Sequence, residues 1–286
     1  MRKVVFIFLL ATLGLYSCGN QNSSFEVVSL NVRYNNPNDA PNDWDNRKSM
    51  VQEFLAGEKP AVIGMQEVLP DQLDDLTGML ENYDYSSAGR EDGKNKGEAC
   101  PVFYRSDRFD SIDGGHFWLS ETPEKPGSMS WNTDFPRIVT WLKLKGLETG
   151  DSFYVFNTHF SHISEEARSK SACLFLEKIA ELVDQAPVVL TGDFNTTRDT
   201  ETYQCLTGGG EDRVLLNDAE MKAKKTQNGD ISYNGFDPEH DGPRIDFVFV
   251  NEFLNVAFHS VDEVHDGKVF ISDHYPVRAQ ITIQSH

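Results

Sequence analysis

The sequence predicts an α/β protein with a four-layer α/β/β/α sandwich, in which two mixed β-sheets pack face to face and helices cover their outer faces. Short apolar runs typical of strands dominate, and three or four helical patterns are interleaved with them. No internal repeat and no change in composition divides the chain. Because 286 residues with 39% hydrophobic content can bury one large core, we expect a single domain over residues 25–286.

Strands are predicted where β-branched and aromatic residues cluster or alternate between turn residues. They cover residues 25–34, 61–67, 101–104, 111–119, 137–145, 153–158, 187–190, 244–250 and 276–283. The strands at 101–104, 111–119 and 137–145 are expected to form a meander, because they follow one another closely and alternate in polarity.

Three helices are predicted from apolar residues at helical spacing. Asp45 is the expected N-cap of the first, which ends at Gly57. A short second helix carries Leu73, Leu76 and Leu80, and Ser164 caps a third that continues to about residue 184.

Three loops separate these elements. Residues 89–98 form a charged, glycine-punctuated loop that we expect to be mobile and either close to a site or simply solvated. Residues 120–135 carry several aromatic residues, and loops of that length often serve function. Residues 208–242 are predicted to be long loops with one or two short strands.

The first 24 residues have the pattern of an export signal followed by a tether. Residues 1–17 combine a basic start, Arg2 and Lys3, with an apolar run too short to span a bilayer comfortably. The sequence Leu15-Tyr16-Ser17-Cys18 resembles a bacterial lipobox, which implies lipidation at Cys18 and a flexible tether over residues 18–24. The expected location is therefore outside the cytoplasm, anchored to a bacterial membrane on its periplasmic or cell-surface face. The alternative is an ordinary cleaved signal peptide with a coincidental cysteine.

Charge and cysteine content narrow the function further. The formal net charge of −19 disfavours loose binding to polyanions, so nucleic acid would need a local basic track. Beyond Cys18 the chain has Cys100, Cys173 and Cys205, which can form at most one disulfide and lack the spacing of a metal finger. They are expected to be core or surface thiols.

Polar residues of chemically useful types end five predicted strands, and a sixth strand carries one inside it. These residues are Asn31, Glu67, His159, Asp193 with Asn195, Asp273 with His274, and, inside the sixth strand, Asp246. Each alone is well explained as a strand-end turn, as in the stretch PVVLTGDFN at residues 187–195. Together they predict one crevice lined by strand ends, where α/β sheets bind ligands.

The blocks LNVR, QEV, NTHFSH, GDFN, RIDFVFV and SDHYPV, in this order and spacing, resemble the signature blocks of the endonuclease/exonuclease/phosphatase superfamily, which includes deoxyribonuclease I. The resemblance covers nearly all of the chain after residue 24. It implies a deoxyribonuclease I-like sandwich and a hydrolase that attacks a phosphate ester with water. It also implies a divalent metal, Mg²⁺ in the first place and Mn²⁺ or Ca²⁺ as alternatives.

The resemblance also implies a role for each residue of this group. Glu67 would bind the metal, with Asn31 and Asp273 beside it. Asp193 would orient or activate water and His274 would act as base or donor, with Asp246 or Asp273 fixing the tautomer of His274. His159 would donate to a phosphate oxygen, and Asn195 would hold one.

Two arginines are expected to contact phosphate. Arg33 stands where the abasic-site enzymes of the superfamily carry a carboxylate, which favours one metal plus an arginine over two metals. Arg137 matches a substrate-facing arginine of deoxyribonuclease I-like members, although it could equally be a solvated arginine at a strand edge. His162, Arg168 and Arg105 could touch substrate but are more typical of surface residues.

The remaining candidates are expected to be structural. Trp118 and Trp131 could wall a pocket, but packing is the commoner role of tryptophan. The histidines His116, His240, His259 and His265 are taken as ordinary.

The expected partners are a phosphate ester and, through Cys18, a membrane. A sugar phosphate, an inositol phosphate or a phospholipid headgroup is favoured. A secreted nuclease is the first alternative, with Lys222, Lys224, Lys225 and the lysines of the 89–98 loop as its basic track. A ligand-binding lipoprotein without catalysis is the second alternative.

Overall fold

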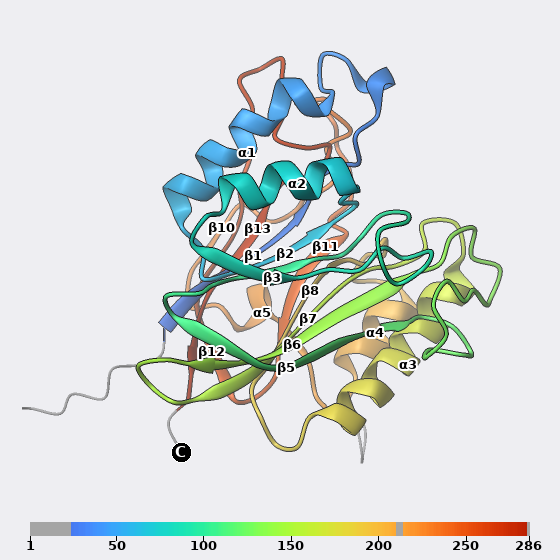
Figure 1. The fold of residues 1–286 in the computed structure, drawn as a ribbon, viewed down its shortest axis with the longest axis vertical. Coiled ribbons are helices and arrows are strands. Elements are labelled where there is room, and N and C mark those ends of the chain that lie inside the picture. Colours follow the sequence, from blue (N-terminus) through green and yellow to red (C-terminus); the bar gives the residue numbers. More distant parts are fainter. Residues whose placement is uncertain (1–23, 210–213, 285–286) are drawn as a thin grey trace, which may run out of the picture.

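The computed structural model describes residues 24–209 and 214–284, and these residues form the predicted four-layer sandwich (Figure 1). In spatial order, one sheet contains β10 (Thr226–Gln227), β12 (Leu254–Val261), β13 (Val277–Ile283), β1 (Ser24–Asn31), β2 (Val62–Gln66), β4 (Val102–Arg105) and β3 (Tyr83–Ser86). The other contains β5 (Phe109–Trp118), β6 (Ile138–Gly146), β7 (Ser152–His159), β8 (Val188–Asp193), β11 (Asp246–Val250) and β9 (Asn217–Asp218). The predicted signal peptide and Cys18 lie outside the described residues, so export and lipidation stay predictions.

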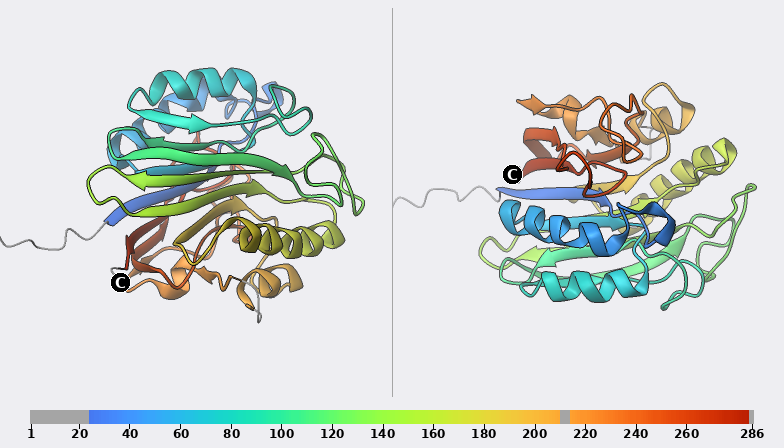
Figure 2. Two further views of the ribbon diagram at one scale, coloured as in Figure 1. Left: turned by 60° about the horizontal axis from the view of Figure 1, so that its bottom comes forward. Right: turned by 90° about the horizontal axis from the view of Figure 1, so that it is seen from above.

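Helices cover the outer face of each sheet (Figure 2). The first sheet is covered by α1 (Trp44–Glu58) and α2 (Pro70–Met79), and the second by α3 (Glu165–Leu182) and α4 (Glu201–Thr207). The short helices η1 (Pro37–Asp39) and α5 (Ala219–Lys222) lie in loops. Within the described part of the chain, none of the helices combines the length and apolar character that crossing a membrane requires.

Three apolar clusters lie between the layers. One strand can contribute to two of them, because alternate residues of a strand point to opposite faces of its sheet. Val27 of β1 lies in the cluster between the sheets, whereas Val28 lies in the cluster under α1 and α2. The third cluster joins α3 to the outer face of the second sheet through Phe175, Leu176 and Ile179. Both sheets are therefore buried on both faces.

A polar layer lies inside this core and fixes one sheet against the other. The side chain of Asn157 donates from Nδ2 to the carbonyl oxygens of Met65 (2.6 Å) and Pro101 (2.9 Å) in the first sheet. Its Oδ1 accepts from Gln66 Nε2 at 2.7 Å. Residue 64 must be glycine here, because a Cβ atom would lie 2.0 Å from Thr191 Oγ1. Such satisfied buried networks specify one arrangement of a core.

Several expectations about individual elements were wrong. The N-cap of α1 is Asp43, whose side chain accepts from the backbone N–H of Asn46, so Asp45 lies inside the first turn. The helix continues past Gly57 and ends at a left-handed Lys59. The predicted meander fails because β4 pairs with β2 in the first sheet, and the chain crosses to the second sheet before β5.

Some elements were missed altogether. The sequence did not predict β3, α4 or β12. β3 is only four residues long, and the burial of β12 is irregular where its register with β13 shifts. Residues 208–242, where described, contain β9, α5 and β10, which agrees with the expected loops and short strands.

Cys173 of α3 and Cys205 of α4 have Sγ atoms 3.1 Å apart, whereas Cys100 is buried elsewhere. We expect oxidised glutathione to join this pair, because the two thiols can pass two electrons and two protons to the glutathione disulfide. Peptide mapping should find Cys173 linked to Cys205. The disulfide should stabilise the fold by about 3 kcal/mol or more, because it lowers the conformational entropy of the unfolded chain. Cys205→Ser is the control, and a disulfide to Cys100 would contradict the prediction.

Candidate functional site

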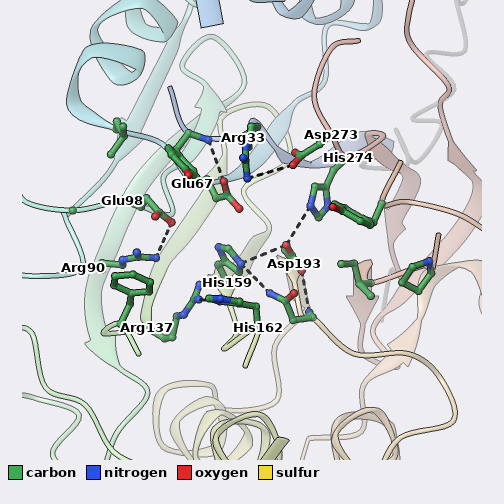
Figure 3. A pocket seen from close by; sticks show the side chains of 18 of the residues that line it. Arg33, Glu67, Arg90, Glu98, Arg137, His159, His162, Asp193, Asp273 and His274 are labelled. Atoms are coloured by element: carbon green, nitrogen blue, oxygen red, sulfur yellow. Dashed lines mark hydrogen bonds and ion pairs between the residues drawn. The ribbon is translucent and has the colours of Figure 1, made fainter. Parts of the chain in front are cut away.

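The polar strand ends meet at one edge of the sandwich, around a cavity of about 880 Å³ (Figure 3). In the first sheet β1 and β2 are parallel, so Asn31 and Glu67 leave the same edge. In the second sheet β7 and β8 are parallel and place His159 beside Asp193. β11 runs in the opposite direction and begins at this edge, where Asp246 pairs with Asp193. The strand directions thus explain why residues far apart in sequence converge.

Asn31 joins the two sheets across the site. Its side chain is fully buried, and Nδ2 donates to Glu67 Oε1 and to Asp193 Oδ2, both at 3.0 Å. Since one amide donates to two carboxylates, these acids are held at a fixed separation while their other oxygen atoms make other contacts.

The loops that follow β1 and β8 begin with the same turn. The backbone N–H of Arg33 donates to Asn31 Oδ1, and that of Asn195 donates to Asp193 Oδ1, each at 2.9 Å. Arg33, Glu67 and Asn195 all adopt positive φ, at 54°, 62° and 49°. Asn195 therefore lies in a turn beyond the end of β8 and does not continue the extended strand. Backbone strain of this kind commonly gathers at functional sites.

Asp193 is the central acid of the site. Burial raises the pKa of its carboxyl to about 7, with Asp246 adding to the rise and His274 opposing it. A carboxylate with a pKa near neutrality can take a proton from water and release it again. A raised pKa of this kind suits a general base.

His274 is held by Asp246. Its Nδ1 lies 2.8 Å from Asp246 Oδ2, and because a carboxylate only accepts, Nδ1 carries a proton. Burial lowers the pKa of His274, but Asp246 and Asp193 outweigh burial and the net pKa is well above its ordinary value. The raised pKa favours the imidazolium form of the ring, and its Nε2 lies 3.8 Å from Asp193 Oδ2. Of the two carboxylates suggested by the sequence, Asp246 and not Asp273 fixes the ring.

His159 is the neutral histidine of the pair. Burial lowers its pKa well below the ordinary value, and the nearby guanidinium groups of Arg137 and Arg90 lower it further. Asn195 Nδ2 lies 3.0 Å from His159 Nε2 and donates also to the carbonyl of Phe160 at 3.1 Å. The 3.4 Å approach of His159 to Asp193 is accordingly a contact of a neutral ring and not an ion pair. Asn195 positions His159. The predicted contacts of Asn195 and His159 with phosphate stay predictions.

Arg33 and Asp273 form the opposite side of the cavity. Arg33 Nη1 lies 3.5 Å from Asp273, and Nε donates to Asp39 at 2.8 Å. Burial lowers the pKa of Arg33, but Asp39, Asp273 and Glu67 outweigh it and raise the net pKa. The buried side chain of Arg47 donates to the carbonyls of Val32, Arg33 and Ile271, and so supports both loops that carry this pair. No sequence pattern distinguished Arg47, because it lies inside a helix with no motif around it.

Glu67 has the features of a cation ligand. Oε1 accepts from Asn31, Oε2 accepts from the backbone N–H of Tyr34 at 3.1 Å, and no arginine or lysine of the described residues forms an ion pair with this carboxylate. One ligand atom from each of Glu67, His159 and Asp193 lies within 4.8 Å of the others. Asp193, Asp246 and His274 make a second such group, but there His274 and Asp246 bind each other. A divalent cation therefore fits best at Glu67.

The structure also shows which of the remaining candidate residues line the cavity. Arg137 is buried and lines the cavity, so it is not a solvated arginine at a strand edge, and its Nη2 lies 3.0 Å from His162 Nδ1. His240 lines the cavity too, although it was expected to be ordinary. The residues that do not line it are Arg105, Arg168, Trp118, Trp131, His116, His259 and His265.

The cavity residues that sequence reasoning missed include Arg90 and Glu98, which lie near the two ends of the charged 89–98 loop. Their signal was present as a glycine next to each of them, at positions 89 and 97. The backbone of this loop closes on itself through a hydrogen bond from Arg90 N to Glu98 O at 3.0 Å, and its mobility stays a prediction. Ser232, which donates to Asp246 at 2.6 Å, was also missed because it lies in a loop without a motif.

Comparison with known proteins agrees with this geometry. The family model described as "Endonuclease/Exonuclease/phosphatase family" matches residues 28–274. An endonuclease/exonuclease/phosphatase of Bacteroides vulgatus is 37% identical, with a TM-score of 0.88 over 92% of this chain and 100% of that chain. The mannosyl-6-phosphatase of Bacteroides thetaiotaomicron is 35% identical, with a TM-score of 0.84 over 90% of this chain and 99% of that chain.

A curated relative extends this similarity to a virus. An uncharacterized protein of Acanthamoeba polyphaga mimivirus is 27% identical over 245 residues, which span 82% of this chain and 90% of that protein. Because the family model covers most of the sequence and every strand end that forms the cavity, the chain belongs to the endonuclease/exonuclease/phosphatase family.

Proposed function

We propose that the protein is a divalent-metal-dependent phosphoric ester hydrolase that attacks a small phosphate ester with water. The observation that carries the proposal is the Asn31 amide, which holds Glu67 and Asp193 at one cavity, beside the imidazolium of His274. Phosphate ester hydrolysis needs neutralisation of charge, an aligned water molecule and a stabilised leaving oxygen. These three requirements correspond to different residues of the site.

Glu67 would hold the cation, with Asn31 and Asp273 supporting it, and Mg²⁺ suits these hard oxygen donors. When bound, the cation would neutralise charge on the phosphate oxygens. Asp193 would accept the proton of the attacking water, since its pKa of about 7 lies near the working range. His274 would donate from Nε2 to an oxygen that gains charge, and the guanidinium of Arg33 would bind the phosphate.

A sugar phosphate is the substrate class that the observations favour. The mannosyl-6-phosphatase of Bacteroides thetaiotaomicron, at 35% identity, is named for a sugar phosphate substrate. A cavity of about 880 Å³ is of the size that holds small molecules. A nuclease would need basic residues beside its active site to bind the nucleic acid. The candidate lysines Lys222, Lys224 and Lys225 do not line the cavity.

A panel of phosphomonoesters and phosphodiesters, assayed with Mg²⁺ and with EDTA, tests the proposal. We expect turnover of phosphomonoesters that EDTA abolishes. Preferred cleavage of plasmid DNA with a steep dependence on salt would support the nuclease alternative. No turnover of any ester, combined with tight ligand binding that survives Asp193→Ala, would support a binding protein without catalysis.

Substitution of the predicted metal ligand Glu67 gives a sharper prediction. Glu67→Gln should raise the Mg²⁺ concentration for half-maximal activity by roughly 10- to 100-fold, because an amide oxygen is a weaker ligand than a carboxylate oxygen. Metal titration of initial rates measures this change, and isothermal titration calorimetry checks it without turnover. Glu53→Gln, at an exposed position of α1, is the matched control and should change nothing. An unchanged metal requirement in Glu67→Gln would place the cation elsewhere.

A further inference from the structure

The cavity has a second wall, formed by residues outside the catalytic group. Arg90 and Glu98 of the 89–98 loop form an ion pair there, with Arg90 Nη1 2.7 Å from Glu98 Oε2. Both side chains are largely buried, with 8% and 18% of their surfaces exposed. Phe135 and Arg137 also line this part of the cavity and complete the wall. Figure 3 shows Arg90, Glu98 and Arg137 on the side of the cavity next to Glu67 and His159. We call these four residues the polar wall.

The polar wall is held in place by the loops around it. Trp118 Nε1 donates to the carbonyl oxygen of Arg90 at 2.6 Å. Gly127 adopts a φ of 72°, and a Cβ atom there would lie 2.2 Å from the carbonyl oxygen of Glu91, so the 120–135 loop packs directly on the 89–98 loop. The guanidinium of Arg90 in turn lies over the ring of Phe135, 4.6 Å from its centroid. The wall is therefore preorganised.

The wall also holds hydrogen-bonding groups that the protein does not use. Arg90 Nε and two nitrogen atoms of Arg137, Nε and Nη1, are buried without a partner in the described residues. Arg90 binds Glu98 through Oε2, and among the described residues no hydrogen bond to Oε1 is found. The ring of Phe135 is 42% exposed. Buried donors left unpaired are uncommon in proteins and point to a ligand that pairs with them.

A simple structural staple accounts for only part of this arrangement. An ion pair that merely closed the loop would need one arginine and one carboxylate, and the backbone hydrogen bond from Arg90 N to Glu98 O already closes it. A second anion is a poor match as well, because the carboxylate of Glu98 would repel it. Donors, an acceptor and an apolar ring together suit a neutral polyhydroxylated ring, which both donates and accepts hydrogen bonds and has an apolar C–H face.

We propose that the polar wall is the leaving-group subsite and binds the hydroxyl groups of a sugar whose phosphate lies at Asp193 and His274. This inference rests on the proposed function and deepens it. Glu98 accepts from ring hydroxyls, Arg90 and Arg137 donate to hydroxyl oxygens, and the ring of Phe135 contacts the C–H face of the sugar.

The test compares mannose 6-phosphate with p-nitrophenyl phosphate, which has no hydroxyl groups. We expect Glu98→Gln to lower kcat/KM for mannose 6-phosphate by roughly 10- to 100-fold, as for loss of a charge-assisted hydrogen bond, and for p-nitrophenyl phosphate by less than about threefold. Arg90→Lys should behave alike, because lysine keeps the charge but loses the fork. Asp107→Asn, which breaks an exposed ion pair with Arg105 outside the cavity, is the matched control and should change neither rate.

The outcomes separate the two proposals. Equal losses on both substrates would mean that Glu98 only supports the fold, and a wild type without preference for the sugar phosphate would mean that no sugar subsite exists; either result overturns the polar wall and leaves the hydrolase proposal standing. A preference for fructose 1,6-bisphosphate that Glu98→Gln strengthens would reveal an anion site instead. If no phosphomonoester is turned over, the proposed function fails together with this inference.

Discussion

Asp193→Asn should lower kcat by about 10³-fold, because the asparagine keeps the shape of the side chain but cannot accept a proton from water. The loss should appear in kcat and kcat/KM alike, since the proton is transferred only in the transition state. Steady-state kinetics on the best phosphomonoester at saturating Mg²⁺ measure it. A rate within tenfold of wild type would remove Asp193 from the role of general base.

The stability of this variant should hardly change. The pKa of Asp193 is raised to about 7 in the folded protein, so its charged form destabilises the fold increasingly from about pH 4 upward and fully above about pH 7. Asparagine removes that cost, which offsets the loss of the hydrogen bond from Asn31 Nδ2. At pH 8 the thermal midpoint is therefore expected to lie close to that of wild type.

Asp218→Asn is the matched control, because Asp218 is equally buried but does not line the cavity. Its carboxylate binds Arg198 at 2.6 Å and Arg244 at 3.3 Å. Removing this charge still leaves both arginines paired with Glu220, so it should cost roughly 1.5–3 kcal/mol of stability, while kcat of the folded fraction stays normal. Asp193→Asn should therefore lose activity but keep its stability, whereas Asp218→Asn should lose stability but keep its activity.

The sequence predicted the layers and the residues of the site better than it predicted local boundaries. The continuous apolar runs of β1 and β8 indicate burial on both faces of a strand, which agrees with their position inside the sandwich. Asn31 and Asp193 each begin a turn at a strand end, as the simple interpretation predicts, and the structure also brings them together at the site. A strand-end turn and a place in the site are therefore compatible, and the catalytic roles of these residues stay predictions.

What the sequence did not predict depends on contacts between distant segments. Whether β4 joins β2 or β5 is decided by packing across the sandwich, and no local pattern encodes that choice. Asp43 caps α1 in place of Asp45 because the two acids are equally suitable by type and only backbone geometry selects one. No sequence motif marks Arg47, yet its burial against the carbonyls of two loops makes it a support of the site.

Asp246→Asn should shift the whole pH–rate profile to lower pH. Asp246 is the largest of the charges that raise the pKa of His274, and it also raises the pKa of Asp193. Without its charge, His274 loses its proton at lower pH, which moves the alkaline limb down. Asp193 becomes deprotonated at lower pH too, which moves the acidic limb in the same direction. At pH 8 we expect a fall in kcat/KM of roughly 10²- to 10³-fold, with a smaller loss at pH 6.

Ser232→Ala is the control for this shift. Ser232 donates to Asp246 Oδ2 at 2.6 Å, so its loss perturbs the same carboxylate without removing the charge. Both limbs should then stay close to those of wild type, although kcat falls modestly as the Asp246 side chain becomes less well held. The limbs belong to the coupled Asp193–His274 pair, so each must be followed across the full pH range. A profile that keeps its position in Asp246→Asn would show that the charge of Asp246 does not set the protonation of the pair, and His274 would then have to act as a neutral ring.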